Sequence, residues 1–240
     1  MTDTLWPGGP SFIDKSGVFK LGTDSVLLAH FASISGIKRC NTAADLGCGS
    51  GIISIILAWN HPKLHIDGVE IKQEAAELAI ENVRLCSMSD RINIIYGDII
   101  RHRDILKSGT YDFTISNPPY YPTKSGKVAK NSGIAAARSE EFCTIEDVCT
   151  AAGYCTRWGG SFFLVHKPER LADIFRSLNN SGFEPKKLRF VHHKANLPPN
   201  LVLIESRRGG KPSLTVQSPL ILTNDDGSDT EEVKEIYHRT

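Results

Sequence analysis

The chain has 240 residues, 40% of them hydrophobic and 23% charged, and a formal net charge of +1. These values are typical of a folded domain with a sizeable core, and they exclude a disordered or collagen-like chain. The longest apolar stretch, residues 52–59, is too short to span a bilayer, and no apolar leader follows Met1. We therefore expect a cytoplasmic protein that does not contact membranes.

Short apolar runs alternate with stretches of helical periodicity in the first half of the chain. The strands that we expect there are residues 42–46, 64–69, 92–95 and 111–116. The helices that we expect there are residues 51–59 and 73–86. This alternation favours right-handed crossovers and an α/β fold, with a mostly parallel sheet covered by helices on both faces.

The second half of the chain continues the alternation. Helices are expected at residues 145–158, 170–179 and 231–238, and strands at residues 161–165, 188–193 and 201–206. Pro198 and Pro199 indicate a loop or hairpin between the last two strands. The polar, lysine-rich stretch 121–131 is expected to be a loop near the functional site.

A glycine-rich turn follows the first expected strand and opens the first expected helix. Its sequence is Asp45-Leu46-Gly47-Cys48-Gly49-Ser50-Gly51. Glycines allow a tight turn and a close approach of the backbone to a ligand, and a helix start offers unpaired N–H groups. A dinucleotide-binding turn would have glycine at the position of Ile52, so another nucleotide-containing ligand is indicated.

This turn resembles motif I of class I S-adenosylmethionine-dependent methyltransferases. The resemblance implies a Rossmann-like fold with a mostly parallel seven-stranded sheet whose last strand is antiparallel, and it implies S-adenosylmethionine as the cofactor. It also implies that Gly47, Gly49 and Gly51 pack against the methionine part of the cofactor, while Asp45 holds its ammonium group.

Two further acids end the next strands of the predicted sheet. Glu70 ends the second strand and could accept hydrogen bonds from both ribose hydroxyls, as second-strand acids do in nucleotide-binding folds. Asp98 and Ile99 end the third strand, where the methyltransferase resemblance implies an acid facing the adenine amino group. Ligands of open α/β sheets bind at the carboxyl ends of the strands, so these residues predict one cofactor site.

The fourth strand runs directly into Asn117-Pro118-Pro119-Tyr120. An exocyclic amino nitrogen is a poor nucleophile, because its lone pair is delocalised into the ring. The Asn117 side-chain oxygen and the Pro118 carbonyl could accept hydrogen bonds from such a group, and the prolines hold both acceptors in place beforehand. Tyr120 offers a ring on which an extruded or unpaired base could stack.

This loop resembles motif IV of methyltransferases that act on amino groups of adenine, guanine, cytosine or glutamine amides. The resemblance implies that Asn117, Pro118, Pro119 and Tyr120 are catalytic, and that Asn117 also lies against the cofactor. It implies direct displacement of the methyl group from sulfonium to nitrogen, without a covalent enzyme intermediate or a metal.

Cysteine and histidine spacing gives no sign of a metal site. None of the six cysteines forms a C-x-x-C pair, and the spacing of Cys143, Cys149 and Cys155 matches no zinc-ligand pattern. The adjacent His192 and His193 would point to opposite faces of a strand. The sequence therefore predicts reduced cysteines and no bound metal.

The stretch before the glycine turn narrows the resemblance to one family. Residues 17–29 read GVFKLGTDSVLLA and resemble the opening of bacterial valine-tRNA adenine-N6 methyltransferases. Residues 137–140 and 219–237 resemble later segments of the same family. The resemblance implies that the enzyme methylates the N6 amino group of an adenine beside the anticodon of a tRNA.

The same resemblance implies one methyltransferase domain over residues 1–240. Residues 1–40 would cover the cofactor, with Lys20, Thr23 and Asp24 in contact with it, and residues 212–240 would form a C-terminal extension.

Positive charge is concentrated after the Asn-Pro-Pro-Tyr loop. Residues 121–211 contain 15 Lys and Arg against 8 Asp and Glu, which suits a polyanionic substrate such as RNA, although a solvated face has the same composition. The candidate phosphate contacts, which as a set predict salt-sensitive binding, are Lys124, Lys127, Lys130, Arg138, Lys186, Lys187, Arg189, Lys194, Arg207, Arg208 and Lys211.

Other functions remain open from the sequence. A glutamine-amide methyltransferase of proteins shares Asn-Pro-Pro-Tyr but usually carries a helical domain before motif I, and only 44 residues precede Asp45 here. A guanine-N2 methyltransferase of ribosomal RNA often has a second domain. A non-catalytic cofactor- or RNA-binding module is a further alternative. The sequence does not determine the RNA, the nucleotide or the oligomeric state.

Overall fold

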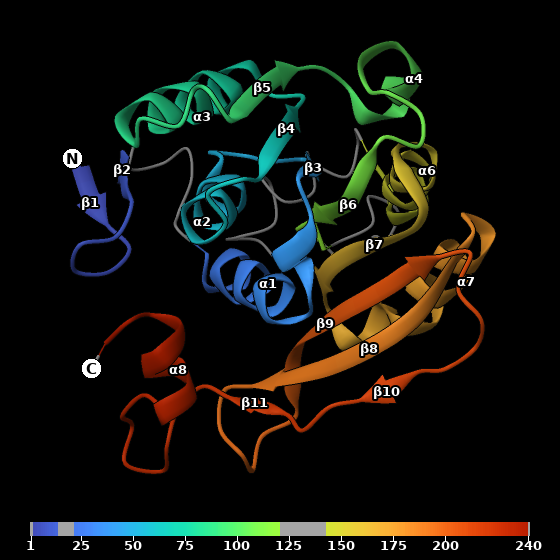
Figure 1. Ribbon diagram of the computed structural model, residues 1–240. Helices are drawn as coiled ribbons and strands as arrows, with labels where there is room; N and C mark the ends of the chain where they lie inside the picture. Colours follow the sequence, from blue (N-terminus) through green and yellow to red (C-terminus); the bar gives the residue numbers. More distant parts are fainter. Residues whose placement is uncertain (1, 14–21, 121–142, 240) are drawn as a thin grey trace, which may run out of the picture.

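The computed structural model describes residues 2–13, 22–120 and 143–239, which are arranged around a central β-sheet (Figure 1). Across the sheet the strands follow the order β10-β8-β9-β7-β6-β3-β4-β5, and β11 also pairs with β8. The strands are β3 (Thr42–Leu46), β4 (His65–Glu70), β5 (Ile92–Tyr96), β6 (Tyr111–Ser116), β7 (Thr156–His166), β8 (Phe183–His192), β9 (Pro199–Arg208), β10 (Thr215–Val216) and β11 (Leu220–Ile221). Strands β3 to β7 are parallel, whereas β9 is antiparallel to β7 and β8. The α/β class and the antiparallel last strand of the predicted seven are confirmed.

The sheet has nine strands rather than the seven expected from the sequence. The two additional strands, β10 and β11, are two residues long and pair in parallel with the outer edge of β8. Strands this short carry no periodic pattern that a sequence could reveal. They pair with backbone groups of β8 that an edge strand otherwise leaves open to other chains.

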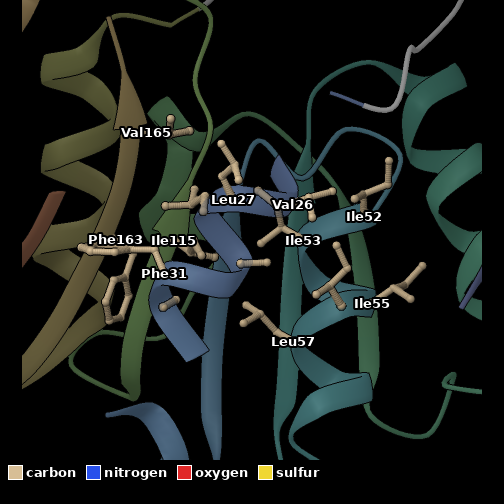
Figure 2. Packing of buried hydrophobic residues seen from close by; sticks show 14 of the residues in the cluster. Val26, Leu27, Phe31, Ile52, Ile53, Ile55, Leu57, Ile115, Phe163 and Val165 are labelled. Carbon is tan, nitrogen blue, oxygen red and sulfur yellow. The ribbon is translucent and has the colours of Figure 1, made fainter. Parts of the chain in front are cut away.

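Helices cover both faces of the sheet, as expected. On one face lie α1 (Thr23–Ile34) and α2 (Ile52–Asn60), and Figure 2 shows Phe31 and Leu27 of α1 close to Ile115 of β6 and Phe163 of β7. On the other face lie α6 (Ile145–Cys155) and α7 (Leu171–Asn180), packed around Phe162. The remaining helices and helical turns are η1 (Ile37–Arg39), α3 (Gln73–Leu85), η2 (Ile99–Arg101), α4 (His102–Ile105), η3 (Pro168–Arg170) and α8 (Glu231–Ile236).

A short hairpin near the N-terminus, β1 (Thr2–Thr4) and β2 (Ser11–Ile13), was not predicted from the sequence. It is attached to α3, because the Ile13 N–H donates to Oδ1 of Asn82 at 2.9 Å. The amide of Asn82, which is buried, also donates to the Ser50 carbonyl at 3.0 Å. One side chain thereby joins the hairpin, α3 and the glycine turn.

The boundary between α6 and β7 differs most from the prediction. Helix α6 ends at Cys155, earlier than expected, and β7 begins at the next residue. The register between β6 and β7 shifts between Tyr111 and Phe113, which marks a bulge. Gly160 allows this course, because a Cβ at that position would lie 2.6 Å from the Asp112 carbonyl oxygen.

The β8–β9 hairpin extends further than expected toward the start of β7. Pro185 lacks the N–H that a continuous ladder needs, and the register of β8 against β9 shifts between Pro185 and Lys187. None of the helices in the described part of the chain has the length and apolar content that a membrane span requires.

An ion pair ties the C-terminal segment to the sheet. Two guanidinium nitrogens of Arg189, on β8, donate to the two carboxylate oxygens of Glu232, on α8, at 2.6 and 2.7 Å. The Arg189 Nε donates to the Ser218 carbonyl at 3.0 Å, and the Arg189 side chain is only 11% exposed. Arg189 therefore donates hydrogen bonds to three acceptor atoms of the segment that follows β9.

Arg189→Ala should lower the free energy of unfolding by about 1–2 kcal/mol, because it removes a bidentate, charge-assisted pair and leaves a half-buried carboxylate unpaired. Thermal melts followed by circular dichroism measure the change. Lys234→Ala is the control, since Lys234 pairs with exposed Glu231 and its loss should leave the melting temperature unchanged. Equal melting temperatures for Arg189→Ala and wild type would contradict the anchoring role.

Candidate active site

A cavity of about 350 Å³ opens at the carboxyl ends of β3, β4, β5 and β6. It is lined by the turn after each of these strands, together with the start of α1 and part of α6. The sequence-predicted residues that line it are Asp24, Gly47, Gly49, Glu70, Asp98, Ile99, Asn117, Pro118, Pro119 and Tyr120. Residues far apart in the chain thus meet in one cavity, as parallel strands ending at the same edge require.

The glycine turn after β3 is shaped for close approach of a ligand. Gly47 has a φ of 79° and lines the cavity, and a Cβ built on it would meet no atom within 4 Å, so a side chain there would protrude into the cavity. The N–H groups of Gly47 and Cys48 both donate to the Val69 carbonyl at 2.9 Å, which fixes the turn to the end of β4.

Gly51 has a packing role that was not expected. It does not line the cavity. Its φ of 82° places it at the start of α2, where a Cβ would lie 3.3 Å from the Cβ of Ala79 on α3. This glycine therefore allows close packing of two helices, and its contact with the cofactor stays a prediction.

Asp45 lies behind the turn and does not line the cavity, so its direct contact with the cofactor stays a prediction. Its carboxylate is fully buried, and Oδ2 accepts a hydrogen bond from the Ser54 hydroxyl at 2.7 Å. The other oxygen has no hydrogen-bond partner among the described residues. Burial raises the pKa of Asp45 to about 7, and the Ser54 hydrogen bonds offset only part of this shift.

Glu70 presents a fixed carboxylate to the cavity. Its Oε2 accepts from the Gly49 N–H at 2.9 Å, and its Oε1 accepts from the Lys72 N–H at 2.8 Å. The remaining lone pairs of both oxygens are free to accept from a ligand, and two neighbouring acceptors match two vicinal hydroxyls. Asp98 lies at the next strand end, and its Oδ1 accepts from the Ile100 N–H at 2.9 Å.

The catalytic-loop residues are held by α1. The Asn117 amide nitrogen donates to the Ser25 hydroxyl at 3.1 Å, and the Tyr120 hydroxyl donates to Oδ1 of Asn117 at 2.9 Å and to the Asp24 carboxylate. A phenol has one proton, so Asp24 and Asn117 compete for it. Burial, followed by the Asp24 charge, raises the pKa of Tyr120 above its ordinary value, so Tyr120 remains protonated.

His166 was not predicted from the sequence, but it packs against Tyr120 with ring centroids 5.3 Å apart in an edge-to-face contact. Its Nδ1 accepts from the Lys167 N–H at 2.7 Å, and burial lowers the pKa of His166 to about 4, so the ring is neutral. The Lys167 ammonium lies 5.1 Å from the Tyr120 ring centroid. The only signal for these residues in the sequence is their position at the end of a predicted strand.

Several predicted contacts lie elsewhere or outside the described residues. Thr23 is exposed at the start of α1 and does not line the cavity. The predictions outside the described residues are Lys20, Lys124, Lys127, Lys130 and Arg138, together with the segments 121–131 and 137–140. No group of three or more His, Cys, Asp or Glu within the described ranges is arranged to hold a metal ion.

Most of the predicted RNA contacts on β8 and β9 have partners within the protein, because neighbouring strands and the C-terminal segment supply acceptors. Lys187 pairs with Glu205 at 2.8 Å, Arg189 is bound to Glu232, and Arg208 donates to the Thr156 carbonyl. Lys194 donates to the Asp225 carbonyl, and Lys186 donates to the Ser213 hydroxyl and the Lys211 carbonyl. Lys187 and Arg189 thus pair with carboxylates of the protein, whereas Arg207 is exposed, and the phosphate contacts stay predictions.

Comparison with known proteins gives the class and then the family. A family model described as the methyltransferase small domain matches residues 11–170. Escherichia coli proteins named tRNA1(Val) (adenine(37)-N6)-methyltransferase, from strains including O157:H7, are 33% identical over 195 residues, which cover 80% of this chain and 77% of theirs.

Solved structures share the fold. The crystal structure of a predicted O-methyltransferase from Agrobacterium tumefaciens matches with a TM-score of 0.73 and 23% identity, over 91% of this chain and 97% of that one. A geranyl diphosphate methyltransferase in complex with S-adenosylmethionine matches with a TM-score of 0.54 and 13% identity, over 82% of this chain and 96% of that one.

The strand order and the antiparallel strand next to β7 are thus those of a class I methyltransferase. The chain belongs to the methyltransferase small domain family, and it is an S-adenosylmethionine-dependent methyltransferase. The cavity fits this cofactor: Glu70 offers paired acceptors for ribose, and Val69 and Val148 offer apolar surface for a purine. The side-chain-free surface of Gly47 leaves room for the methionine part.

Asp45→Asn tests the buried carboxyl. An unfolded Asp ionises near pH 3.9, whereas Asp45 in the folded protein keeps its proton to about pH 7. Wild-type stability therefore falls as pH rises between these values, while the neutral Asn variant lacks this loss. The melting temperature of Asp45→Asn minus that of the wild type should therefore increase by about 3 °C or more between pH 5 and pH 8.

Asp112→Asn is the control for this measurement. Although burial raises the pKa of Asp112, hydrogen bonds from Asn41 and Thr42 and the charge of Arg157 lower it overall. The stability that Asp112 provides is therefore lost only as pH falls below about 4, so the melting-temperature difference of its variant should stay constant from pH 5 to pH 8. A melting-temperature difference for Asp45→Asn that does not change with pH would contradict the raised pKa.

Ser25→Ala tests the hydrogen bond by which α1 orients the Asn117 side chain. Without the Ser25 hydroxyl, the Asn117 amide loses the acceptor that orients it, so kcat should fall about 10–100-fold. Affinity for S-adenosylhomocysteine, measured by calorimetry, should change little, because Ser25 does not line the cavity. Ser33→Ala, at the other end of α1, is the control, and an unchanged kcat for Ser25→Ala would rule out the positioning role.

Proposed function

We propose that this enzyme transfers a methyl group from S-adenosylmethionine to the exocyclic N6 amino group of an adenine in tRNA, beside the anticodon. The observation that carries the proposal is Asn117-Pro118-Pro119-Tyr120, placed at the wall of the cofactor cavity with its polar groups held by α1. The similarity to the Escherichia coli tRNA1(Val) (adenine(37)-N6)-methyltransferases supports adenine in tRNA as the acceptor. Because its proposed substrate is tRNA, we expect the enzyme to act in the cytoplasm.

Bound S-adenosylmethionine supplies a methyl group on a positively charged sulfur. The protein positions the amino group that receives the methyl group. The Asn117 Oδ1 and the Pro118 carbonyl accept hydrogen bonds from the incoming amino group, which favours a more tetrahedral nitrogen with an available lone pair. The prolines restrict φ, so these acceptors do not have to be ordered at the moment of reaction.

Entry of the amino group has a consequence for Tyr120. The amino N–H takes the place of the phenol proton at Asn117 Oδ1, and the phenol then donates to Asp24 alone. Asn117 Oδ1 therefore becomes available to the amino group, and the Tyr120 hydroxyl keeps a hydrogen-bond partner in Asp24. The new N-methyl ammonium then gives its extra proton to solvent water, and its lone pair regains conjugation with the ring.

Asn117→Ala should abolish methyl transfer to tRNA, with a loss of kcat of at least about 100-fold, because it removes a preorganised acceptor. Asn117→Asp is the matched variant, since it keeps an oxygen at the same place and should retain more activity than Ala. The measurements are transfer of labelled methyl to total tRNA and mass analysis of the nucleosides. Binding of S-adenosylhomocysteine, measured by calorimetry, checks that both variants keep the cofactor site.

Label that appears as N6-methyladenosine in tRNA supports the proposal. Label in a protein glutamine, or N2-methylguanosine in ribosomal RNA, would replace it with one of the alternative acceptors.

A further inference from the structure

One aromatic side chain is unusually exposed and lies far from the catalytic loop. Trp158, near the start of β7, is 75% exposed, the highest value of any large hydrophobic side chain in the described part of the chain. One side of its indole lies against Gly209, at the end of β9, where a Cβ would overlap the ring. The indole ring therefore packs against the glycine backbone on one side, while most of the ring surface faces solvent.

Basic residues lie in the segments next to this ring. Arg157 precedes it in the chain, Arg207 and Arg208 end β9, and Lys211 follows in the turn that contains Gly209. Lys186 of β8 reaches the same turn, since its Cε would lie 2.8 Å from a Cβ on Gly210. We call Trp158 and these five cations the Trp158 patch.

The charge of the Trp158 patch is only partly neutralised. Arg157 pairs with Asp112 at 2.7 Å, and Glu184 lies opposite Arg207 in the β8–β9 register. The other hydrogen bonds of the patch leave its charge intact, because Arg208 and Lys186 donate to carbonyl and hydroxyl groups. In the segments next to the ring, five cations therefore outnumber the two carboxylates.

A flat aromatic surface within a cluster of cations recognises unpaired nucleotides. A base stacks on the indole, and the cations contact the adjoining phosphates, without a requirement for a particular base. Neither element alone would be informative, because single exposed aromatics and solvated lysines are both common. A protein partner would bury the ring as well, but it would not require an excess of positive charge.

We propose that the Trp158 patch is a second RNA-binding site, which stacks an unpaired base of the substrate RNA away from the nucleotide that is methylated. This inference rests on the proposed function for the identity of the RNA as tRNA. It adds an aromatic contact that the basic residues of β8 and β9 do not by themselves provide.

The position of the patch defines what it can do. Strand β7 joins Trp158 to His166, which contacts Tyr120, and eight residues of strand span about 26 Å. A folded RNA can therefore engage both places, whereas a short oligonucleotide cannot. The patch should strengthen RNA binding without affecting the chemical step.

Trp158→Ala should weaken tRNA binding about tenfold and raise the KM for tRNA to a similar extent, with kcat unchanged, because one stacking contact is lost. Trp158→Phe keeps a ring and should stay within about threefold of wild type. Trp59→Phe, at the exposed end of α2, is the matched control and should bind normally. Filter binding with total tRNA and steady-state methyl transfer measure these effects.

Two readouts distinguish stacking from a structural effect. Total tRNA should quench tryptophan fluorescence in the wild type and in Trp59→Phe, but much less in Trp158→Phe. Arg207→Ala should reduce the slope of log affinity against log salt by about 1, since it removes one phosphate contact.

Unchanged tRNA affinity in Trp158→Ala would overturn the proposal. It would also be overturned if sedimentation showed a self-association that Trp158→Ala abolishes while tRNA affinity stays constant, because the patch would then join copies of the chain. If the wild type binds tRNA through Trp158 but transfers no methyl group to it, the proposed function fails and the RNA site stands.

Discussion

The hydrogen bonds between the start of α1 and the catalytic loop are the contacts on which the active geometry depends. Asp24 and Ser25 hold Tyr120 and Asn117, which lie more than 90 residues later in the chain. Prolines restrict the backbone of the loop, but they do not fix the rotation of an amide or a phenol. That rotation is fixed by α1, whose own position depends on its packing against α2 and β7. The orientation of these two side chains is therefore a consequence of core packing.

The cofactor side of the cavity is built on a different arrangement. Backbone N–H groups of Gly49 and Lys72 donate to the Glu70 carboxyl group. These hydrogen bonds fix its position beside the cavity without a cationic side chain. Asp45 occupies a buried place behind the same turn, where ionisation is costly and its pKa is raised to about 7. Two acids at successive strand ends thus have different environments: Glu70 accepts two backbone hydrogen bonds beside the cavity, whereas Asp45 is buried where its ionisation is disfavoured.

The β8–β9 hairpin shows why a count of basic residues is a poor guide to an RNA-binding surface. Lys187 and Arg189 pair with carboxylates of β9 and α8, and they stabilise the edge of the sheet. Exposed basic residues, Arg207 and Lys211, lie where β9 ends, near Trp158. Strand β7 links the Trp158 patch to the cavity wall. His166, at one end of the strand, contacts Tyr120, and the exposed Trp158 lies near the other end.

The sequence alone determined the α/β class, the seven main strands and most residues that line the cavity, because hydrophobic periodicity and glycine turns are local properties of a chain. It also located Glu70 and Asn117, since residues that follow parallel strands must meet at one edge of the sheet. Only the tertiary structure decided the roles of Ser25 and His166, the withdrawal of Asp45 from the cavity, and the exposure of Trp158. Each of these depends on which distant segments pack together, and side-chain partners across more than 90 residues leave no local pattern in a single sequence.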